Sequence, residues 1–438
     1  MMRDWPMTRL ADLMDVKHGF AFPGTHICDE PVGDVLVTPG NFAIGGGFKS
    51  DRFKYYNGDV PNDYVLAEGD LIVTMTDLSK QADTLGYAAR VPKSDGRRYL
   101  HNQRIGKVLP KPAAAVDTRF LFYVLCSAEY RHEVLASATG TAVRHTSPSR
   151  ILAHAFGLPP LPEQRAIASV LGALDDKIDL NRRMCHTLEE MARALFKSWF
   201  VDFDPVRAKM EGRDPGLPKE IADLFPSRLV DSELGPIPEG WSAKPLDEVA
   251  DFLNGLALQK YPPQDGFATL PALKIAQLKR ADTSGADRCS AEVPAPYRVV
   301  DGDLIFSWSG SLEVAIWTGG AAALNQHLFK VTSDRFPSWC LYQWVCQHLP
   351  EFRQIAADKA TTMGHIQRRH LSAARVAVPS DAVRRVADSI FGPMTDRILA
   401  TRIESRTLAA LRDTLLPKLI SGELRVPASL GSMQEVST

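Results

Sequence analysis

The chain has 438 residues, too many for a single hydrophobic core, and fits two to four domains. Hydrophobic residues make up 45% and charged residues 24%, as is usual for a globular protein. Its 51 basic and 52 acidic residues nearly cancel, which argues against non-specific coating of nucleic acid but leaves room for local basic surfaces.

Residues 1–158 are predicted to form a first mixed α/β domain. β-branched runs at residues 35–38 and 70–75 predict strands, and the glycines and prolines at residues 39–47 predict turns between them. A helix is expected over residues 118–136 because apolar residues recur there on one side.

Residues 159–202 are predicted to form a long helix. After Pro162, one stripe of residues recurs at alternating steps of four and three, which is the pattern of a coiled-coil seam. The seam positions of this first helix are Ile167, Leu171, Leu174, Ile178, Asn181, Cys185, Leu188, Ala192, Leu195 and Trp199.

A proline-rich, charged stretch at residues 203–235 is predicted to be a surface connector with a short helix near residues 219–224. Residues 236–378 then repeat the first domain. The repeat includes a strand at residues 303–308 and a helix over residues 337–357.

Residues 379–425 are predicted to form a second long helix, and the small, polar residues 426–438 a disordered tail. The second seam is mostly apolar, with polar residues near its middle. Its positions are Ala387, Phe391, Met394, Ile398, Thr401, Ser405, Leu408, Arg412, Leu415 and Leu419.

The two halves of the chain are similar in sequence. Residues 68–72 (Glu-Gly-Asp-Leu-Ile) return as residues 301–305 (Asp-Gly-Asp-Leu-Ile), and from Thr141 onward the halves match without a gap. We therefore expect an α+β fold with two pseudo-symmetric mixed α/β domains separated by two long antiparallel coiled-coil helices. Two unrelated surface helices, each packed on its own domain, remain the alternative.

The sequence shows no sign of export, membrane insertion or a bound metal. Its first residues lack the apolar core of a signal peptide, and no run of about 18 apolar residues is present to span a membrane. The six cysteines lack the paired spacing of a zinc site and suit a reducing compartment. We expect a cytoplasmic protein without a metal.

Three stretches resemble a known family. Residues 158–165 (Leu-Pro-Pro-Leu-Pro-Glu-Gln-Arg), followed by the long helix, are similar to the first conserved region of type I restriction-modification specificity subunits, called HsdS. Residues 195–206 (Leu-Phe-Lys-Ser-Trp-Phe-Val-Asp-Phe-Asp-Pro-Val) resemble the region after that helix. Residues 234–241 (Leu-Gly-Pro-Ile-Pro-Glu-Gly-Trp) resemble the start of the second target recognition domain.

The chain departs from the family pattern at two places. The first domain opens with Arg-Asp-Trp at residues 3–5 and lacks the Pro-Glu-Gly-Trp that opens the second. The second helix opens with Val-Pro-Ser-Asp at residues 378–381 and has no Glu-Gln pair. The second departure leaves open whether both helices engage partners equally well.

The resemblance implies a specific role. Such a subunit reads an asymmetric, bipartite sequence in double-stranded DNA, with one half-site for each recognition domain. The helices hold the domains apart and carry two methyltransferase subunits, which bind S-adenosylmethionine and methylate adenine. Restriction subunits, with ATP and Mg²⁺, join such complexes for defence by cleavage; whether they accompany this chain stays open. No cofactor is expected on the chain itself.

The sequence lacks motifs for catalysis by the chain alone. It has no Asn/Asp-Pro-Pro-aromatic pocket for a flipped adenine, no Walker motif for ATP and no His-Glu-x-x-His zinc motif. We therefore expect a non-catalytic DNA-binding subunit. Two alternatives are the recognition portion of a single-chain restriction-methylation enzyme and a coiled-coil adaptor without a role on DNA.

DNA readers are expected among cations, aromatic residues and amides, because these side chains contact phosphates and base edges. Each candidate also fits an ordinary solvated surface residue. In the first domain they are Lys49, Arg52, Lys54, Tyr55, Lys80, Gln81, Arg97, Arg98 and Arg104. In the second they are Lys274, Gln277, Lys279, Arg280, Gln326 and His327.

Some polar residues recur at matching places in both halves. Because base readers should differ between domains, the Asn-Gln pairs at residues 102–103 and 325–326 favour a scaffold role. His145 and His365 recur as well, and either cap the backbone or belong to a loop that faces DNA.

Overall fold

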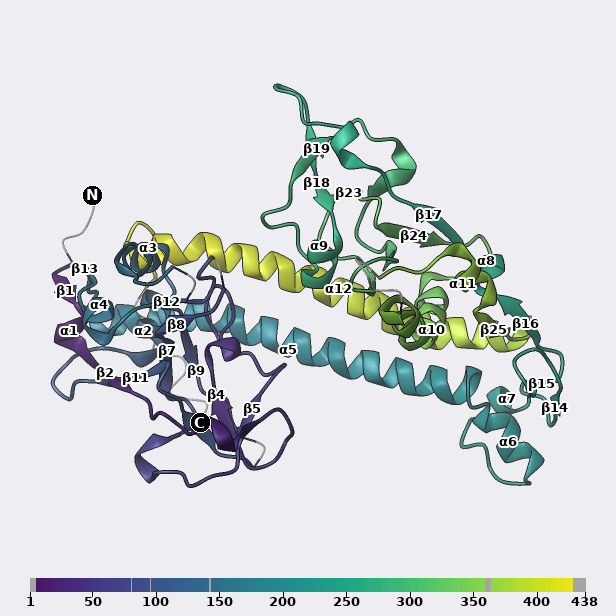
Figure 1. Ribbon diagram of the computed structural model, residues 1–438, viewed down its shortest axis with the longest axis horizontal. Coiled ribbons are helices and arrows are strands. Elements are labelled where there is room, and N and C mark those ends of the chain that lie inside the picture. The colour runs from purple at the N-terminus through teal and green to yellow at the C-terminus, as the bar shows by residue number, and fades with distance from the viewer. Residues whose placement is uncertain (1–4, 80, 95, 142, 359–363, 428–438) are drawn as a thin grey trace. The chain divides into compact units, whose positions relative to one another are not determined.

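The computed structural model describes residues 5–427 apart from residues 80, 95, 142 and 359–363. The chain forms two compact units, unit 1 from Met1–Asp176 with Leu408–Thr438 and unit 2 from Lys177–Thr407. Two helices of 40 residues each, α5 (Leu161–Phe200) and α12 (Asp381–Ile420), contribute to both units (Figure 1).

Unit 1 contains two sheets, which we call inner and outer. The inner sheet consists, in spatial order, of β2 (Met14–His18), β11 (Ile105–Pro110), β7 (Leu71–Thr74) and β9 (Ala88–Arg90). The outer sheet consists of β3 (Ile27–Cys28), β5 (Lys54–Tyr56), β4 (Asp34–Val37), β10 (Tyr99–His101) and β6 (Val65–Leu66). Smaller pairs are β1 (Met7–Arg9) with β13 (Ala155–Gly157), and β8 (Thr76–Asp77) with β12 (Arg144–His145).

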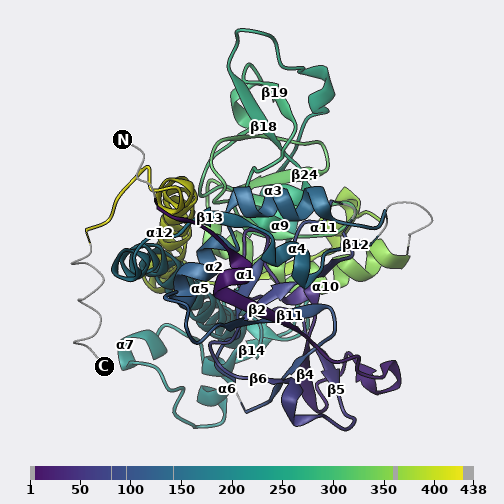
Figure 2. The same cartoon turned by 90° about the vertical axis from the view of Figure 1, so that its left-hand side faces the viewer.

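The inner sheet of unit 1 is buried on both faces. Alternate residues of a strand point to opposite faces, so Val73 packs with the helices while Ile72 packs against the outer sheet. The outer sheet accordingly lies on the side of the unit away from α12 (Figures 1 and 2). This burial explains why β7 reads as a continuous apolar run.

The prediction of one helix over residues 118–136 is wrong, because two helices are present. They are α2 (Thr118–Val124) and α3 (Ala128–Ser137). Ser127 interrupts the helix with extended backbone, and its hydroxyl accepts a hydrogen bond from the Tyr130 amide as the N-cap of α3. Two shorter helices of unit 1 are α1 (Leu10–Leu13) and α4 (Pro148–Leu152).

Unit 2 repeats this topology. Its inner sheet has β17 (Asp251–Asn254), β24 (Leu328–Thr332), β21 (Leu304–Ser307) and β22 (Val314–Ile316) in the same spatial order as unit 1. Its outer sheet has β19 (Arg288–Ser290), β18 (Thr269–Leu273), β23 (Ala322–Leu324) and β20 (Arg298–Val299). β16 (Ser242–Pro245) pairs with β25 (Arg375–Val378), as β1 pairs with β13.

The helices of unit 2 agree more closely with the predictions from the sequence. The helix expected over residues 337–357 is α10 (Ser338–Asp358). Unit 2 also has α8 (Leu246–Val249), α9 (Ile275–Arg280) and α11 (Arg368–Ala373).

The connector is less irregular than its prolines suggest. It contains the expected short helix, α7 (Lys219–Ala222), and a helix that we did not expect, α6 (Asp204–Met210). A small pair, β14 (Leu229–Val230) with β15 (Ile237–Pro238), follows. Most of the tail predicted to be disordered, residues 428–438, lies outside the described residues.

The long helices pack antiparallel within each unit. In unit 2, Asn181 donates a hydrogen bond to Glu404 (2.8 Å), and Cys185, one turn later on α5, contacts the Ile398 carbonyl (3.8 Å), earlier on α12. In unit 1, Asp175 pairs with Arg412 on the C-terminal part of α12. The expected fold class, α+β with two mixed domains and two long antiparallel helices, is confirmed.

Three polar seam positions of unit 2 are buried. Asn181, Cys185 and Thr401 are 0%, 6% and 2% exposed. Asn181 bonds to Glu404, the neighbour of the polar seam position Ser405. The other expected seam positions are buried or half-buried, as far as the structure describes them: Leu171, Leu174, Ile178, Leu188, Leu195, Phe391, Met394, Ile398, Ser405, Leu408 and Leu415. Among the described residues, no helix is apolar and long enough to cross a membrane.

Candidate nucleic-acid interface

A hollow of about 630 Å³ opens in unit 1 at one edge of the outer sheet. We call it the first hollow. The strands β4 and β10 are parallel, so their carboxyl ends meet at this edge, and the residues that follow each strand line the opening. Its polar lining includes Thr38, Lys49, Lys54, Asn102, Gln103 and Arg104.

Unit 2 has a hollow of about 580 Å³ at the corresponding edge, which we call the second hollow. Here the parallel strands are β18 and β23, and the residues after them line the opening in the same way. Its polar lining includes Gln259, Lys274, Arg288, Asn325, Gln326 and His327. The two hollows thus occupy the same place in one repeated fold.

One tight turn follows the inner parallel strand in both hollows. The Asn102 side-chain oxygen accepts a hydrogen bond from the Arg104 amide (3.0 Å), and the Asn325 oxygen accepts one from the His327 amide (3.3 Å). A glycine faces each turn. In the first hollow, a Cβ atom on Gly19 would lie 2.0 Å from the Asn102 carbonyl oxygen, so the close approach requires glycine. The Asn of the recurring Asn-Gln pair therefore shapes the backbone, as a scaffold role requires.

An acidic loop borders the first hollow. The Asp77 carboxylate accepts hydrogen bonds from the amides of Ser79 (2.6 Å) and Thr84 (2.5 Å) and from the Thr84 hydroxyl. Burial alone raises the pKa of Asp77, but these hydrogen bonds outweigh it and hold the pKa below its ordinary value. The charged carboxylate therefore orders its own loop at the edge of the hollow.

The chain is similar to proteins of one family over nearly its whole length. The family model described as "Type I restriction modification DNA specificity domain" matches residues 2–190. The HindI specificity subunit of Haemophilus influenzae is 26% identical, covering 72% of this chain and 80% of that protein. The MjaIX specificity subunit of Methanocaldococcus jannaschii is 23% identical, with coverage of 97% and 94%.

A crystal structure supports the same assignment at the level of the fold. The S subunit of the type I restriction-modification system from M. genitalium aligns with a TM-score of 0.55 at 14% identity, over 95% of this chain and 96% of that one. The chain is thus similar, over nearly its whole length, to the type I restriction-modification specificity subunits. Members of this family are non-catalytic DNA specificity components and bind no cofactor themselves. The similarity argues against the two alternatives, a single-chain enzyme and an adaptor without a role on DNA.

The structure brings three of the first domain's candidates to the first hollow. Lys49 pairs with Asp51 (3.3 Å), Lys54 pairs with Asp29 (2.6 Å), and Arg104 stands at the turn.

Other candidates of the first domain serve the protein's own structure. The Arg98 guanidinium forms a two-pronged ion pair with Asp34, which raises the pKa of Arg98. Arg97 lies 5.1 Å from the ring of the half-buried Tyr55. Arg52 is exposed and outside the hollow, and Lys80 lies outside the described residues.

In the second domain, Lys274, Gln326 and His327 line the second hollow. Gln277 is buried, and its side-chain oxygen accepts a hydrogen bond from the Lys274 amide (3.3 Å). It therefore caps α9 and is not positioned as a reader.

The two remaining candidates lie outside the lining of the second hollow. Lys279 pairs with Glu313 (3.7 Å). Arg280 bonds to the Ser284 carbonyl (2.8 Å) in its own loop.

The recurring histidines hold the backbone. His145 lies on β12, and its Nδ1 is 3.1 Å from the Thr76 hydroxyl on the paired strand β8. His365 bridges to Ser309, the counterpart of Thr76, and its ring contacts Trp308. Each histidine thus connects the segment that carries it to the residues that follow the inner strand β7 or β21.

Sequence reasoning missed several residues of the hollows, including Thr38, Asp77, Gln259 and Arg288. They come from separate strands and loops that only the fold brings together. A signal was available for Thr38, because it directly follows the apolar run at residues 35–37. Among the described residues, no three His, Cys, Asp or Glu side chains are grouped to hold a metal ion.

Proposed function

We propose that this specificity subunit reads an asymmetric, bipartite DNA sequence, with one half-site for each recognition domain. The observation that carries the proposal is the pair of hollows, which share a fold and a turn but differ in their side chains. A shared framework supports the same docking on the duplex, and different side chains support different base sequences. The recognition domains are proposed to be residues 1–158 and 236–378.

We also propose that α5 and α12 set the distance between the half-sites. The seam of α5 from Ile167 to Trp199 spans about 50 Å at about 1.5 Å per residue. Reading elements that lean inward from such a spacer suit half-sites one DNA turn apart, about 34–36 Å. Half-sites of a few base pairs would then leave an unread gap of roughly 5–8 bp.

The proposed partners are two methyltransferase subunits on the helices, which would bring S-adenosylmethionine and adenine methylation to both half-sites. ATP and Mg²⁺ belong to restriction subunits in such complexes. Because such a complex would act on cellular DNA, the proposed location is the cytoplasm. The chain alone should transfer no methyl group, because the sequence carries no pocket motif for a flipped adenine.

Domain exchange tests the proposal. Residues 1–158 are replaced by the corresponding domain of another specificity subunit, and the complex with its methyltransferase subunits methylates a randomised DNA library. Sequencing of the methylated adenines should show one half-site changed and the other kept. A change in both half-sites, or in neither, would show that the domains are not independent readers.

A further inference from the structure

The turns at the two hollows combine a constant part with a variable part. Asn-Gln is constant, as residues 102–103 and 325–326, and Asn fixes the turn through the amide of the third residue. The third residue differs, being Arg104 in the first hollow and His327 in the second. The repeated backbone therefore presents two different side chains from one structural position.

Among the residues that the structure describes, Arg104 has no ion-pair partner, unlike the other cations of the first hollow. Lys49 and Lys54 are neutralised by Asp51 and Asp29. Within the described ranges, no hydrogen bond or ion pair engages the Arg104 guanidinium, which is exposed. Its backbone is nevertheless held at both polar groups, since its carbonyl accepts from the Met75 amide (2.9 Å). A fixed backbone with a free guanidinium suits recognition of a ligand.

The second hollow shows the same division of roles. Lys274 forms an ion pair with Asp287, and the Arg288 guanidinium bonds to the Thr269 hydroxyl (2.7 Å). The His327 ring is oriented by one nitrogen, Nδ1, which lies 3.0 Å from the Ser309 hydroxyl. Its other nitrogen, Nε2, has only a 3.5 Å contact with the neighbouring Gln326. An oriented ring with one weakly engaged nitrogen is well placed to contact a base edge.

We infer that the third residue of this turn is a specificity-determining residue in each recognition domain, and that Arg104 reads a guanine in the first half-site. The inference rests on the proposed division of the DNA sequence between the domains. Arginine is the side chain best suited to guanine, because its planar fork bonds to both O6 and N7 in the major groove. Histidine lacks this fork, so the second half-site should have a different base requirement at the corresponding position.

The experiment uses the full chain with its methyltransferase subunits and a randomised DNA library, with methylated adenines as the readout. Arg104→His should reduce the preference for guanine at one position of one half-site by about 5- to 150-fold, the factor that one good two-pronged contact supplies. The other half-site should be unchanged. His327→Arg should alter one position of the opposite half-site only.

Two further variants separate base reading from other effects. Arg104→Lys keeps the charge but loses the fork, so it should also lower the guanine preference. Arg119→His is the matched control, because Arg119 is an exposed arginine on α2 outside the hollow, and it should preserve both half-sites. Thermal melting checks that each variant is folded.

Two results would overturn the inference while leaving the proposed function intact. One is an unchanged sequence preference in Arg104→His. The other is uniform weakening on all sequences, which marks a phosphate contact. By contrast, failure of the domain exchange to separate the half-sites would overturn the proposed function itself.

Discussion

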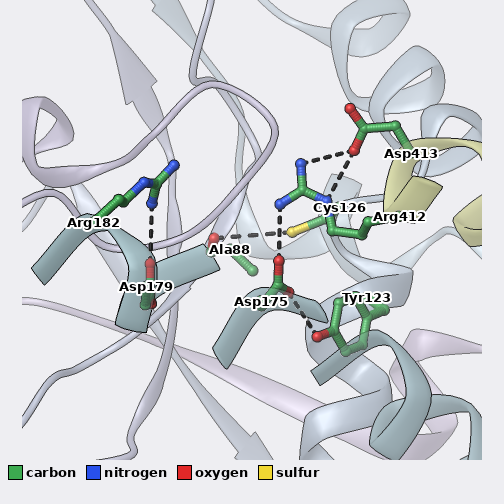
Figure 3. Close-up of polar contacts among 8 residues, drawn as sticks. All are labelled: Ala88, Tyr123, Cys126, Asp175, Asp179, Arg182, Arg412 and Asp413. Carbon is green, nitrogen blue, oxygen red and sulfur yellow. Dashed lines mark hydrogen bonds and ion pairs between the residues drawn. The ribbon is translucent and has the colours of Figure 1, made fainter. Parts of the chain in front are cut away.

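Arg412→Ala should destabilise unit 1 through a network that couples α12 to α5 and α2. The Arg412 guanidinium donates to Asp175 (2.8 Å) and Asp413 (2.7 Å), and the Tyr123 hydroxyl donates to the other oxygen of Asp175 (2.7 Å), as Figure 3 shows. Burial alone lowers the pKa of Arg412, but the two carboxylates outweigh it and raise the pKa above its ordinary value. The guanidinium therefore stays charged and bonded.

The expected loss of unfolding free energy depends on how deeply the ion pair is buried. Removing one partner of a fully buried ion pair costs about 3–5 kcal/mol, because the other charge is left without compensation. Arg412 and Asp175 are each 27% exposed, so solvent screens part of this loss. We expect Arg412→Ala to cost about 2 kcal/mol, which corresponds to about 4–8 °C in the melting temperature of a unit of this size.

Unit 2 supplies the compensating variant. At the positions that match Asp175 and Arg412 in the helix repeat, it has Thr395 and Ala192, which line a cavity of about 40 Å³ beside Tyr342. Neutral residues are thus tolerated at this junction. The double variant Asp175→Thr with Arg412→Ala copies unit 2 and should be less destabilised than the sum of the two single variants, by about 1 kcal/mol or more.

Calorimetry of the full chain, with hydrogen exchange to assign the change to unit 1, measures these effects. Arg182→Ala is the control, because Arg182 pairs with Asp179 on the surface of α5 with side chains 73% and 65% exposed. It should cost less than about 0.5 kcal/mol. The reasoning is refuted by an Arg412→Ala loss no larger than this control, or by strict additivity in the double variant.

Three further predictions concern pH, register and spacing. Burial lowers the pKa of His101, a residue that is 1% exposed, to about 4. Because the unfolded chain binds this proton more tightly, unit 1 should lose up to about 3 kcal/mol of unfolding free energy as the pH falls from about 6.5 to about 4, and it should have full stability above that window. His101→Leu, which copies Leu324 of unit 2, should flatten this dependence in urea titrations. Thr401→Cys should form a disulfide with Cys185 under mild oxidation, and Ser405→Cys should not. The reaction should be slow, because burial raises the pKa of the Cys185 thiol. The reverse order on a non-reducing gel would contradict the register of α5 against α12. Inserting four residues, roughly 6 Å of helix, into both α5 and α12 should lengthen the gap between the methylated half-sites or abolish methylation; an unchanged gap would show that the helices are not the spacer.

The sequence by itself determined the features that depend on local pattern and repetition. The seam of α5 and α12 is visible because a coiled coil needs apolar residues at steps of three and four. The central strands β7 and β21 are visible because burial on both faces requires continuous apolar runs. The doubled architecture is visible because the repeat itself lies in the order of residues. In contrast, the break between α2 and α3 depends on one capping hydroxyl, Ser127, whose effect competes with a good helical pattern.

Only the tertiary structure decided which side chains line the hollows and which charges remain without partners. The hollows exist because β4 pairs in parallel with β10, and β18 with β23, across long loops that carry no signal for their pairing. In the sequence, Arg98 and Arg104 are equivalent surface cations. In the fold, Arg98 is held by Asp34, which is distant along the chain. Arg104 lies on a fixed turn, and its guanidinium has no partner in the described part of the chain. The energy of a charge depends on its neighbours in space, and those neighbours are set by the fold.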